Sequence, residues 1–233
     1  MSAPGLAGLL RRAGEWLVEP ADRAPLNAPP ELAVVPTPRF PLVGVVGLAR
    51  RCGTTTLARA LAAELALRRD GAAVVASPSR PAIVPLGSTR QAGQLADSLA
   101  LDERRAAGRL CLAACADAAR LASATRGVAP AVMEVEPGTA ALDAAPALDR
   151  VVLVASPDLE PALAAAVAQT IAAVAEPPVV AVNRAPDHGP WLVHGDVLVP
   201  DSRVGARLAL AGREPRGWLG RAIGQLADLC DAV

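Results

Sequence analysis

One segment near the start of the chain constrains its fold more than any other. Residues 41–60 read PLVGVVGLARRCGTTTLARA, which is an apolar valine-rich run, a short polar turn, a Gly-Thr-Thr-Thr step and an alanine- and leucine-rich stretch. This order predicts a buried strand, a loop and a helix. In such a loop, successive backbone N–H groups and the positive end of the helix dipole can surround a phosphate group. We therefore expect a phosphate-binding turn here.

The turn has lost the charged group that a P-loop uses. When Gly53-Thr54-Thr55 is aligned with the Gly-Lys-Ser/Thr step, Thr54 takes the lysine position and Thr55 takes the position whose hydroxyl holds Mg²⁺. Every basic residue of the chain is an arginine, so no lysine can act from elsewhere. Losing a charge-assisted hydrogen bond weakens binding by about 1.5–3 kcal/mol. The sequence thus predicts phosphate binding without efficient hydrolysis.

The interior of the turn also differs from a P-loop. Arg50 and Arg51 stand where glycines are usual, and Leu48 takes the first motif position. Either arginine can contact a phosphate through two parallel hydrogen bonds. A divergent ATPase in which Arg50 or Arg51 replaces the lysine is therefore an alternative. In a second alternative the chain binds no nucleotide, and the three threonines only cap the helix.

The rest of the chain alternates between strand and helix patterns. We predict strands at 42–46, 72–76, 131–135, 150–155, 178–183 and 196–199, and helices at 54–69, 160–175, 203–211 and 216–231. We also predict a helical region at 91–125, broken near Leu101–Asp102, with Cys111 and Cys115 buried on one helix face. Short strands without polar alternation are typical of sheets covered on both faces. The fold class expected is α/β, a doubly wound, mainly parallel sheet flanked by helices.

Three parts of different character follow one another along the chain. Residues 1–19 have the spacing of a short amphipathic helix, residues 20–40 form a proline-rich linker, and residues 41–233 hold the alternating pattern. The helix has three candidate roles: docking on the main domain, binding a protein partner, or lying on a membrane. Its two basic residues and short apolar face favour the first two over the third.

Composition limits the function classes. The net charge is zero, so a nucleic-acid partner is unlikely. The most apolar stretch, at 161–182, is interrupted by polar residues and prolines, so no transmembrane segment is expected. Four cysteines without a metal-ligand pattern and the lack of a signal-peptide pattern predict a reducing, cytoplasmic location. The abundance of alanine and arginine suggests a GC-rich bacterial genome.

Five segments together resemble the MinD/ParA family of P-loop ATPases. They are the loop with its helix and second strand (GTTTLARALAAELALRRDGAAVVA), AVMEVEPG, RVVLVASPDLEPALAA, VVAVNRA and DVLVPDSRVGARLALAGREP. Their order and spacing carry the resemblance, which covers residues 41–233. Glu134 takes the position of the family's switch aspartate, although it can also be a plain strand-end carboxylate. The family's signature lysine falls on Ala49, and its Asp-x-Asp element falls on Ala76-Ser77-Pro78.

The resemblance implies a ligand and a set of binding residues. The cofactor would be ATP or ADP with Mg²⁺, the metal would be held by Thr55 and Glu134, and a homodimer would form through the P-loop face. The implied nucleotide-binding residues are Arg50, Arg51, Cys52, Gly53, Thr54, Thr55, Thr56, Asn183, Pro200 and Asp201.

Loss of the catalytic charges favours one function within this resemblance. We expect a degenerate member, a pseudo-ATPase that serves as a scaffold or localisation factor, cytoplasmic and peripheral at the membrane or cell pole. Atypical family members that act in pilus assembly and pole localisation use the fold in this way. A ligase of the dethiobiotin-synthetase type is a further alternative, but it would also need the missing lysine.

Overall fold

Valine-rich strands form the centre of the structure. The computed structural model describes residues 39–79, 87–186 and 189–231, which belong to one compact unit of the chain. The predicted helix at 1–19 and nearly all of the predicted linker at 20–40 lie outside the described residues. All six residues of β1 (Leu42–Gly47) are buried. A strand covered on both faces has no polar side to show, which explains the unbroken apolar run.

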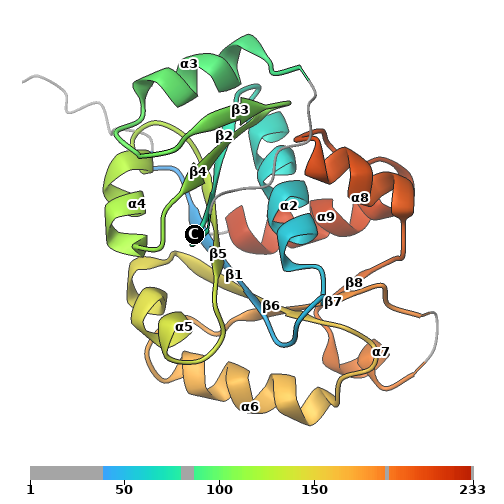
Figure 1. The fold of residues 1–233 in the computed structure, drawn as a ribbon. Coiled ribbons are helices and arrows are strands. Elements are labelled where there is room, and N and C mark those ends of the chain that lie inside the picture. Colours follow the sequence, from blue (N-terminus) through green and yellow to red (C-terminus); the bar gives the residue numbers. More distant parts are fainter. Residues whose placement is uncertain (1–38, 80–86, 187–188, 232–233) are drawn as a thin grey trace, which may run out of the picture. The chain divides into compact units, whose positions relative to one another are not determined.

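The described residues form an eight-stranded sheet with helices on both faces (Figure 1). The strand order is β3-β4-β2-β5-β1-β6-β7-β8. All neighbouring strands run parallel except β3 and β4, which pair antiparallel at one edge. The doubly wound, mainly parallel sheet predicted from the sequence is confirmed. Besides β1, the strands are β2 (Ala73–Ser77), β3 (Arg105–Ala107), β4 (Leu110–Ala114), β5 (Ala131–Val135), β6 (Arg150–Ala155), β7 (Val179–Asn183) and β8 (Val197–Val199).

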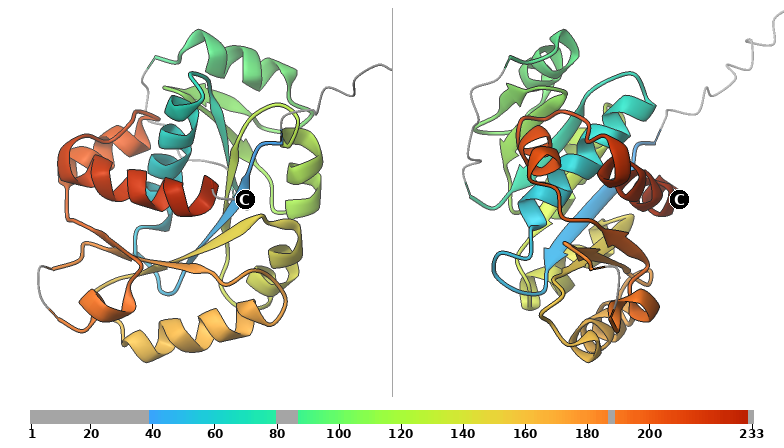
Figure 2. Two further views of the ribbon diagram at one scale, coloured as in Figure 1. Left: turned by 180° about the vertical axis from the view of Figure 1, so that it is seen from behind. Right: turned by 90° about the vertical axis from the view of Figure 1, so that its right-hand side faces the viewer.

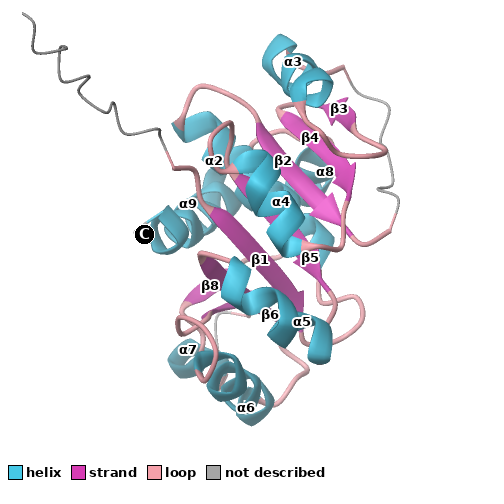
Figure 3. Ribbon diagram, turned by 90° about the vertical axis from the view of Figure 1, so that its left-hand side faces the viewer, coloured by secondary structure: helices cyan, strands magenta, loops and turns pink. Residues whose placement is uncertain are grey.

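Two apolar layers pack on opposite faces of this sheet. On one face, α2 (Thr54–Arg68), α8 (Arg203–Leu210) and α9 (Gly217–Asp231) bury Leu57, Leu61 and Ile223 against β1. Both views of Figure 2 show these three helices side by side. On the other face, helices that include α4 and α5 lie in front of the sheet in Figure 3. The helices not yet delimited are α3 (Arg90–Ser98), α4 (Ala118–Thr125), α5 (Thr139–Ala144), α6 (Pro161–Ala172) and α7 (Trp191–His194).

The prediction of a helical region at 91–125 is wrong in its middle. β3 and β4 occupy that stretch, and Cys111 lies inside β4 while Cys115 follows it. The two cysteines therefore share no helix face, although both are buried as expected. The sequence LCLAA is buried along almost its whole length. An apolar run buried on both faces shows neither a helix period nor a strand period, so its composition misled the prediction.

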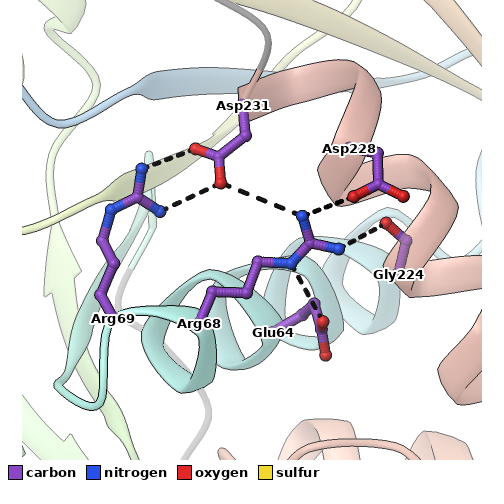
Figure 4. A network of polar contacts seen from close by, with 6 residues as sticks. All are labelled: Glu64, Arg68, Arg69, Gly224, Asp228 and Asp231. Atoms are coloured by element: carbon purple, nitrogen blue, oxygen red, sulfur yellow. Dashed lines mark hydrogen bonds and ion pairs between the residues drawn. The ribbon is translucent and has the colours of Figure 1, made fainter.

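A network of ion pairs fastens α9 to the C-terminal end of α2 (Figure 4). The Arg68 guanidinium lies 2.7 Å from Asp228 and 3.1 Å from Glu64, and it donates to the Gly224 carbonyl over 2.8 Å. Arg69 lies 2.6 Å from Asp231. These contacts lie at the C-terminal end of α2, whereas the β1–α2 loop lies at its N-terminal end. They add to the buried apolar contacts through which α9 packs on α2.

Candidate functional site

The loop between β1 and α2 has a backbone shape suited to anions. Arg51 has φ 64° and Gly53 has φ 96°, while their neighbours have negative φ. Alternation of this kind is typical of a concave nest for an anion, and within it the Cys52 N–H donates to the Ala49 carbonyl over 3.4 Å. Gly53 has a second reason to be glycine, because a Cβ there would collide with Asn183 Nδ2.

The N-terminus of α2 keeps its first amides available. Its N-cap is Gly53, and no side chain among the described residues caps it. Two of the three threonine hydroxyls are engaged elsewhere: Thr54 Oγ1 lies 3.3 Å from Cys52 Sγ, and Thr55 Oγ1 donates to Glu134. An uncapped N-terminus leaves N–H groups that water or an anionic ligand must satisfy. For Thr54 and Thr55, the alternative in which threonines cap α2 therefore lacks the hydrogen bond it requires.

Thr55 and Glu134 meet at the position expected for a metal. Thr55 Oγ1 donates to Glu134 Oε2 over 2.7 Å, which joins α2 to the end of β5. Burial raises the pKa of Glu134 above its ordinary value, against the opposing effects of the Thr55 hydrogen bond and the positive charge of Arg59. A hydroxyl and a carboxylate are oxygen ligands that suit Mg²⁺, which normally completes its shell with water and substrate phosphates. The residues present therefore fit that ion.

Two cavities flank the loop on opposite sides. One, of about 300 Å³, is lined by Arg50, Thr54 and Glu134 together with the ends of β2 and β5. The other, of about 210 Å³, is lined by Gly53, Thr56, Asn183, Pro200, Asp201 and Leu219 among others. Arg51 lines both. The loop thus separates a cavity on the Glu134 side from one on the Asn183 side.

Side chains from β7 and its following loop hold the turn in place. Asn183 Nδ2 donates to the Cys52 carbonyl over 2.8 Å, and Arg184 donates to the Arg51 carbonyl over 3.2 Å. The Asn183 amide, predicted to contact a base, thus also supports the loop backbone. Cys52 itself is buried beneath the loop. The structure therefore brings all the predicted binding residues together around this one turn.

Sequence reasoning missed Arg59, which lies in α2 with only 2% of its surface exposed. Its Nη1 donates to the Leu210 carbonyl at the end of α8 over 2.8 Å, and its charge acts on Glu134. Burial lowers the pKa of the Arg59 guanidinium. The sequence does contain a signal for Arg59. It follows Thr55 by four residues, and residues four apart lie on the same face of a helix.

The cavity on the Asn183 side includes another contribution that the sequence does not predict. Leu219 and Ile223 reach it from α9, near the end of the chain. No spacing rule links these residues to a loop so distant in sequence. Only the packing of α9 against α2 brings them to the site.

Comparison with known proteins places the fold. No protein-family model matches the chain, and no curated protein sequence matches it. Among solved structures, a ParA family ATPase from Chlorobium tepidum TLS superposes with a TM-score of 0.58 at 14% identity, covering 81% of this chain and 98% of that one. A putative plasmid partition protein from Borrelia burgdorferi B31, bound to AMPPNP, gives 0.56 at 8% identity, with 84% and 100% covered.

The septum site-determining protein MinD from Pyrococcus horikoshii OT3, complexed with Mg-ADP, gives a TM-score of 0.54 at 14% identity, with 83% of this chain and 96% of that one covered. All three superpose along nearly their whole lengths, so the match concerns the complete sheet and its helices. The chain has a MinD/ParA-like P-loop NTPase fold.

Proposed function

We propose that this protein binds ATP or ADP with Mg²⁺ at the turn between β1 and α2 and hydrolyses ATP poorly. The observation that carries the proposal is the uncapped N-terminus of α2, set between two cavities with the Thr55–Glu134 pair on one side. Free amides, a helix dipole and a concave backbone together favour a phosphate.

Each cavity would take a different part of the nucleotide. The amides of Gly53, Thr54 and Thr55 would face the phosphate chain, with Cys52 supporting the turn from below. Thr55 and Glu134 would hold Mg²⁺, which when bound would neutralise phosphate charge. Thr56, Asn183, Pro200 and Asp201 would surround the ribose and base in the cavity of about 210 Å³.

Weak catalysis follows from the groups that are missing. Phosphoryl transfer depends on positioning the nucleophile and on neutralising the charge that develops in the transition state. Thr54 and Ala49 replace the two lysines, and Ala76, Ser77 and Pro78 replace the acidic element after β2. The Ser77 hydroxyl donates to the Ser79 carbonyl over 2.6 Å, so it too is engaged within the loop.

A protein that binds nucleotide but hydrolyses ATP poorly suits a scaffold or localisation role. We propose that nucleotide binding promotes a homodimer through the P-loop face, and that residues 1–19 contact a protein partner. The protein itself would be cytoplasmic and peripheral at the membrane or cell pole. Among the described residues no helix has both the length and the apolar character needed to span a membrane. Two of the superposing structures are complexes with a nucleotide, AMPPNP in one and Mg-ADP in the other, which supports a nucleotide role for this fold.

Calorimetric titration with ATP and ADP, with and without Mg²⁺, tests the proposal. We expect saturable binding that Mg²⁺ strengthens in the wild-type protein, and loss of this Mg²⁺ effect in Thr55→Ala. Thr54→Lys, which restores the missing ammonium, should tighten binding on the order of tenfold to a hundredfold. Wild-type turnover at the rate of an active ATPase would contradict the pseudo-ATPase assignment. Absence of binding at millimolar nucleotide would contradict the whole proposal.

A divergent ATPase is the second candidate, and the position of Arg51 favours it. Arg51 lines both cavities, and Arg50 lines the one beside Glu134. Either guanidinium could contact phosphates from there. This candidate predicts measurable turnover that Arg50→Ala or Arg51→Ala abolishes, while Arg213→Ala, an exposed arginine that lines neither cavity, leaves it unchanged.

A further inference from the structure

A third and larger cavity lies beside the cavity proposed for the base. It has a volume of about 940 Å³ and is bounded by α7, the loop after β8 and the start of α9. Pro200, Asp201, Ser202 and Leu219 line both cavities, so these residues form a common wall. A volume of this size falls within the range of small-molecule sites, roughly 300–1,000 Å³.

An exposed tryptophan stands at this cavity. Trp218 is 74% exposed, although the whole chain has only three tryptophans and one phenylalanine. The Arg221 guanidinium lies over its ring, 4.5 Å from the centroid. At an exposed site such a contact contributes about 0.5–1 kcal/mol. Trp218 and Arg221 both line the cavity, so a stacked aromatic–cation pair borders it.

The charges around the cavity are mainly positive. Arg216 and Arg221 line it, and neither forms an ion pair with any residue that the structure describes. Among the described lining residues, Asp201 is the one carboxylate. Leu192, Leu198 and Leu219 supply an apolar interior. Unpaired guanidinium groups beside an aromatic ring and an apolar wall are complementary to an aromatic anion.

We propose that this cavity is a second ligand site, which binds a small molecule with a planar aromatic body and a carboxylate, sulfonate or phosphate group. The aromatic body stacks on Trp218 and rests against the three leucines, while Arg216 and Arg221 bind the anionic group. The site shares Pro200 and Asp201 with the cavity proposed for the base, but Arg216, Trp218 and Arg221 do not line that cavity, so binding of an aromatic anion here does not require nucleotide.

Two matched fluorescent probes test this site directly. Anilinonaphthalene sulfonate carries an aromatic body and an anionic group, and N-phenylnaphthylamine is its uncharged counterpart. We expect the sulfonate to bind about tenfold more tightly than the neutral probe, since a hydrogen bond between charged groups contributes about 1.5–3 kcal/mol and the neutral probe makes none with the arginines. Energy transfer from tryptophan to the bound sulfonate should fall equally in Trp218→Ala and Trp218→Phe, to the part that Trp16 and Trp191 supply, whereas only Trp218→Phe should keep the affinity, because it keeps an aromatic ring.

Variants separate the charge contribution from the aromatic one. Arg216→Gln with Arg221→Gln should remove the preference for the sulfonate, whereas Arg213→Gln, an exposed arginine outside the cavity, should leave it intact. Trp218→Ala should weaken both probes about tenfold. Thr55→Ala should not change either affinity, so a failed nucleotide proposal and a failed ligand-site proposal give different results.

Three results would overturn the inference. Equal affinity for the two probes would mean that the surface is only apolar. Sulfonate binding that survives Trp218→Ala and the double arginine variant would place the probe elsewhere. A concentration-dependent dimer that Trp218→Ala abolishes would instead identify this surface as an interface between two copies of the chain.

Discussion

The Thr55 hydroxyl donates to the Glu134 carboxylate across 2.7 Å, which joins the first turn of α2 to the end of β5. Burial of this carboxylate raises its pKa in the folded protein above the value of an exposed glutamic acid. A raised pKa means that the folded state favours the neutral form. Stability from this group is therefore present at low pH and is lost as the pH rises through the folded pKa.

Glu134→Gln tests this linkage, because glutamine can still accept the Thr55 hydrogen bond but does not titrate. The free energy of unfolding of the wild type, minus that of Glu134→Gln, should fall as the pH rises from about 4.3, the ordinary value for glutamic acid, and then level off. Chemical denaturation over a pH series measures the difference. A difference that rises with pH, or stays constant, would contradict the burial of this carboxylate.

The conformation of Gly53 makes a second prediction. Gly53→Ala combines a positive φ with a collision against Asn183, so it should destabilise the protein by at least about 1–3 kcal/mol. Gly93→Ala is the matched control, because Gly93 lies in α3 with open space around the added Cβ. Alanine is the better helix former by up to about 1 kcal/mol, so this variant should be neutral or more stable. Similar destabilisation by both substitutions would count against the loop geometry.

Arg59 ties α2 to the end of α8 from within the core. Arg59→Ala should destabilise the protein by about 2–4 kcal/mol, because it removes a buried charge that faces Glu134 and leaves the Leu210 carbonyl without this donor. Arg207→Ala, at an exposed position on α8, should change stability by less than about 0.5 kcal/mol. Urea denaturation compares the two. An equally small effect of both variants would show that Arg59 is not engaged as described.

The cysteines give a prediction that depends on the corrected structure of 91–125. All four thiols are buried, and burial raises the pKa to about 11 for Cys111 and to about 12 for Cys230. Because the thiolate is the reactive form, the native protein should react slowly with an aromatic disulfide reagent. The denatured protein should titrate all four quickly. Rapid reaction of Cys111 in the native protein would contradict its place inside β4.

The contrast between β1 and β4 shows what could be predicted from sequence. β1 was predicted nearly to its ends because a valine-rich run is followed directly by the glycine turn and the start of α2. β4 was missed because Leu110–Ala114 consists of residues equally common in buried helices. The neighbours of β4 in the sheet decide its structure, and those neighbours are far away in sequence.

The candidate site shows the same division. Residues 50–56 were found together because the motif is continuous in sequence. Asn183, Pro200 and Asp201 were named only through a family resemblance, and the structure places them at the same turn. Arg59 and Leu219 were missed because their contributions depend on how α2, α8 and α9 pack.

The central claim is that the turn between β1 and α2 still binds phosphate groups without its lysine. The most direct measurement is the affinity for adenosine, AMP and ADP in one calorimetric series on the Trp218→Ala variant, which lacks the aromatic ring of the proposed second site, because the amides of such a turn contact the α- and β-phosphates. The account predicts that affinity rises along the series, with ADP at least about tenfold tighter than adenosine. Equal affinity for all three compounds, or binding of none, would contradict it.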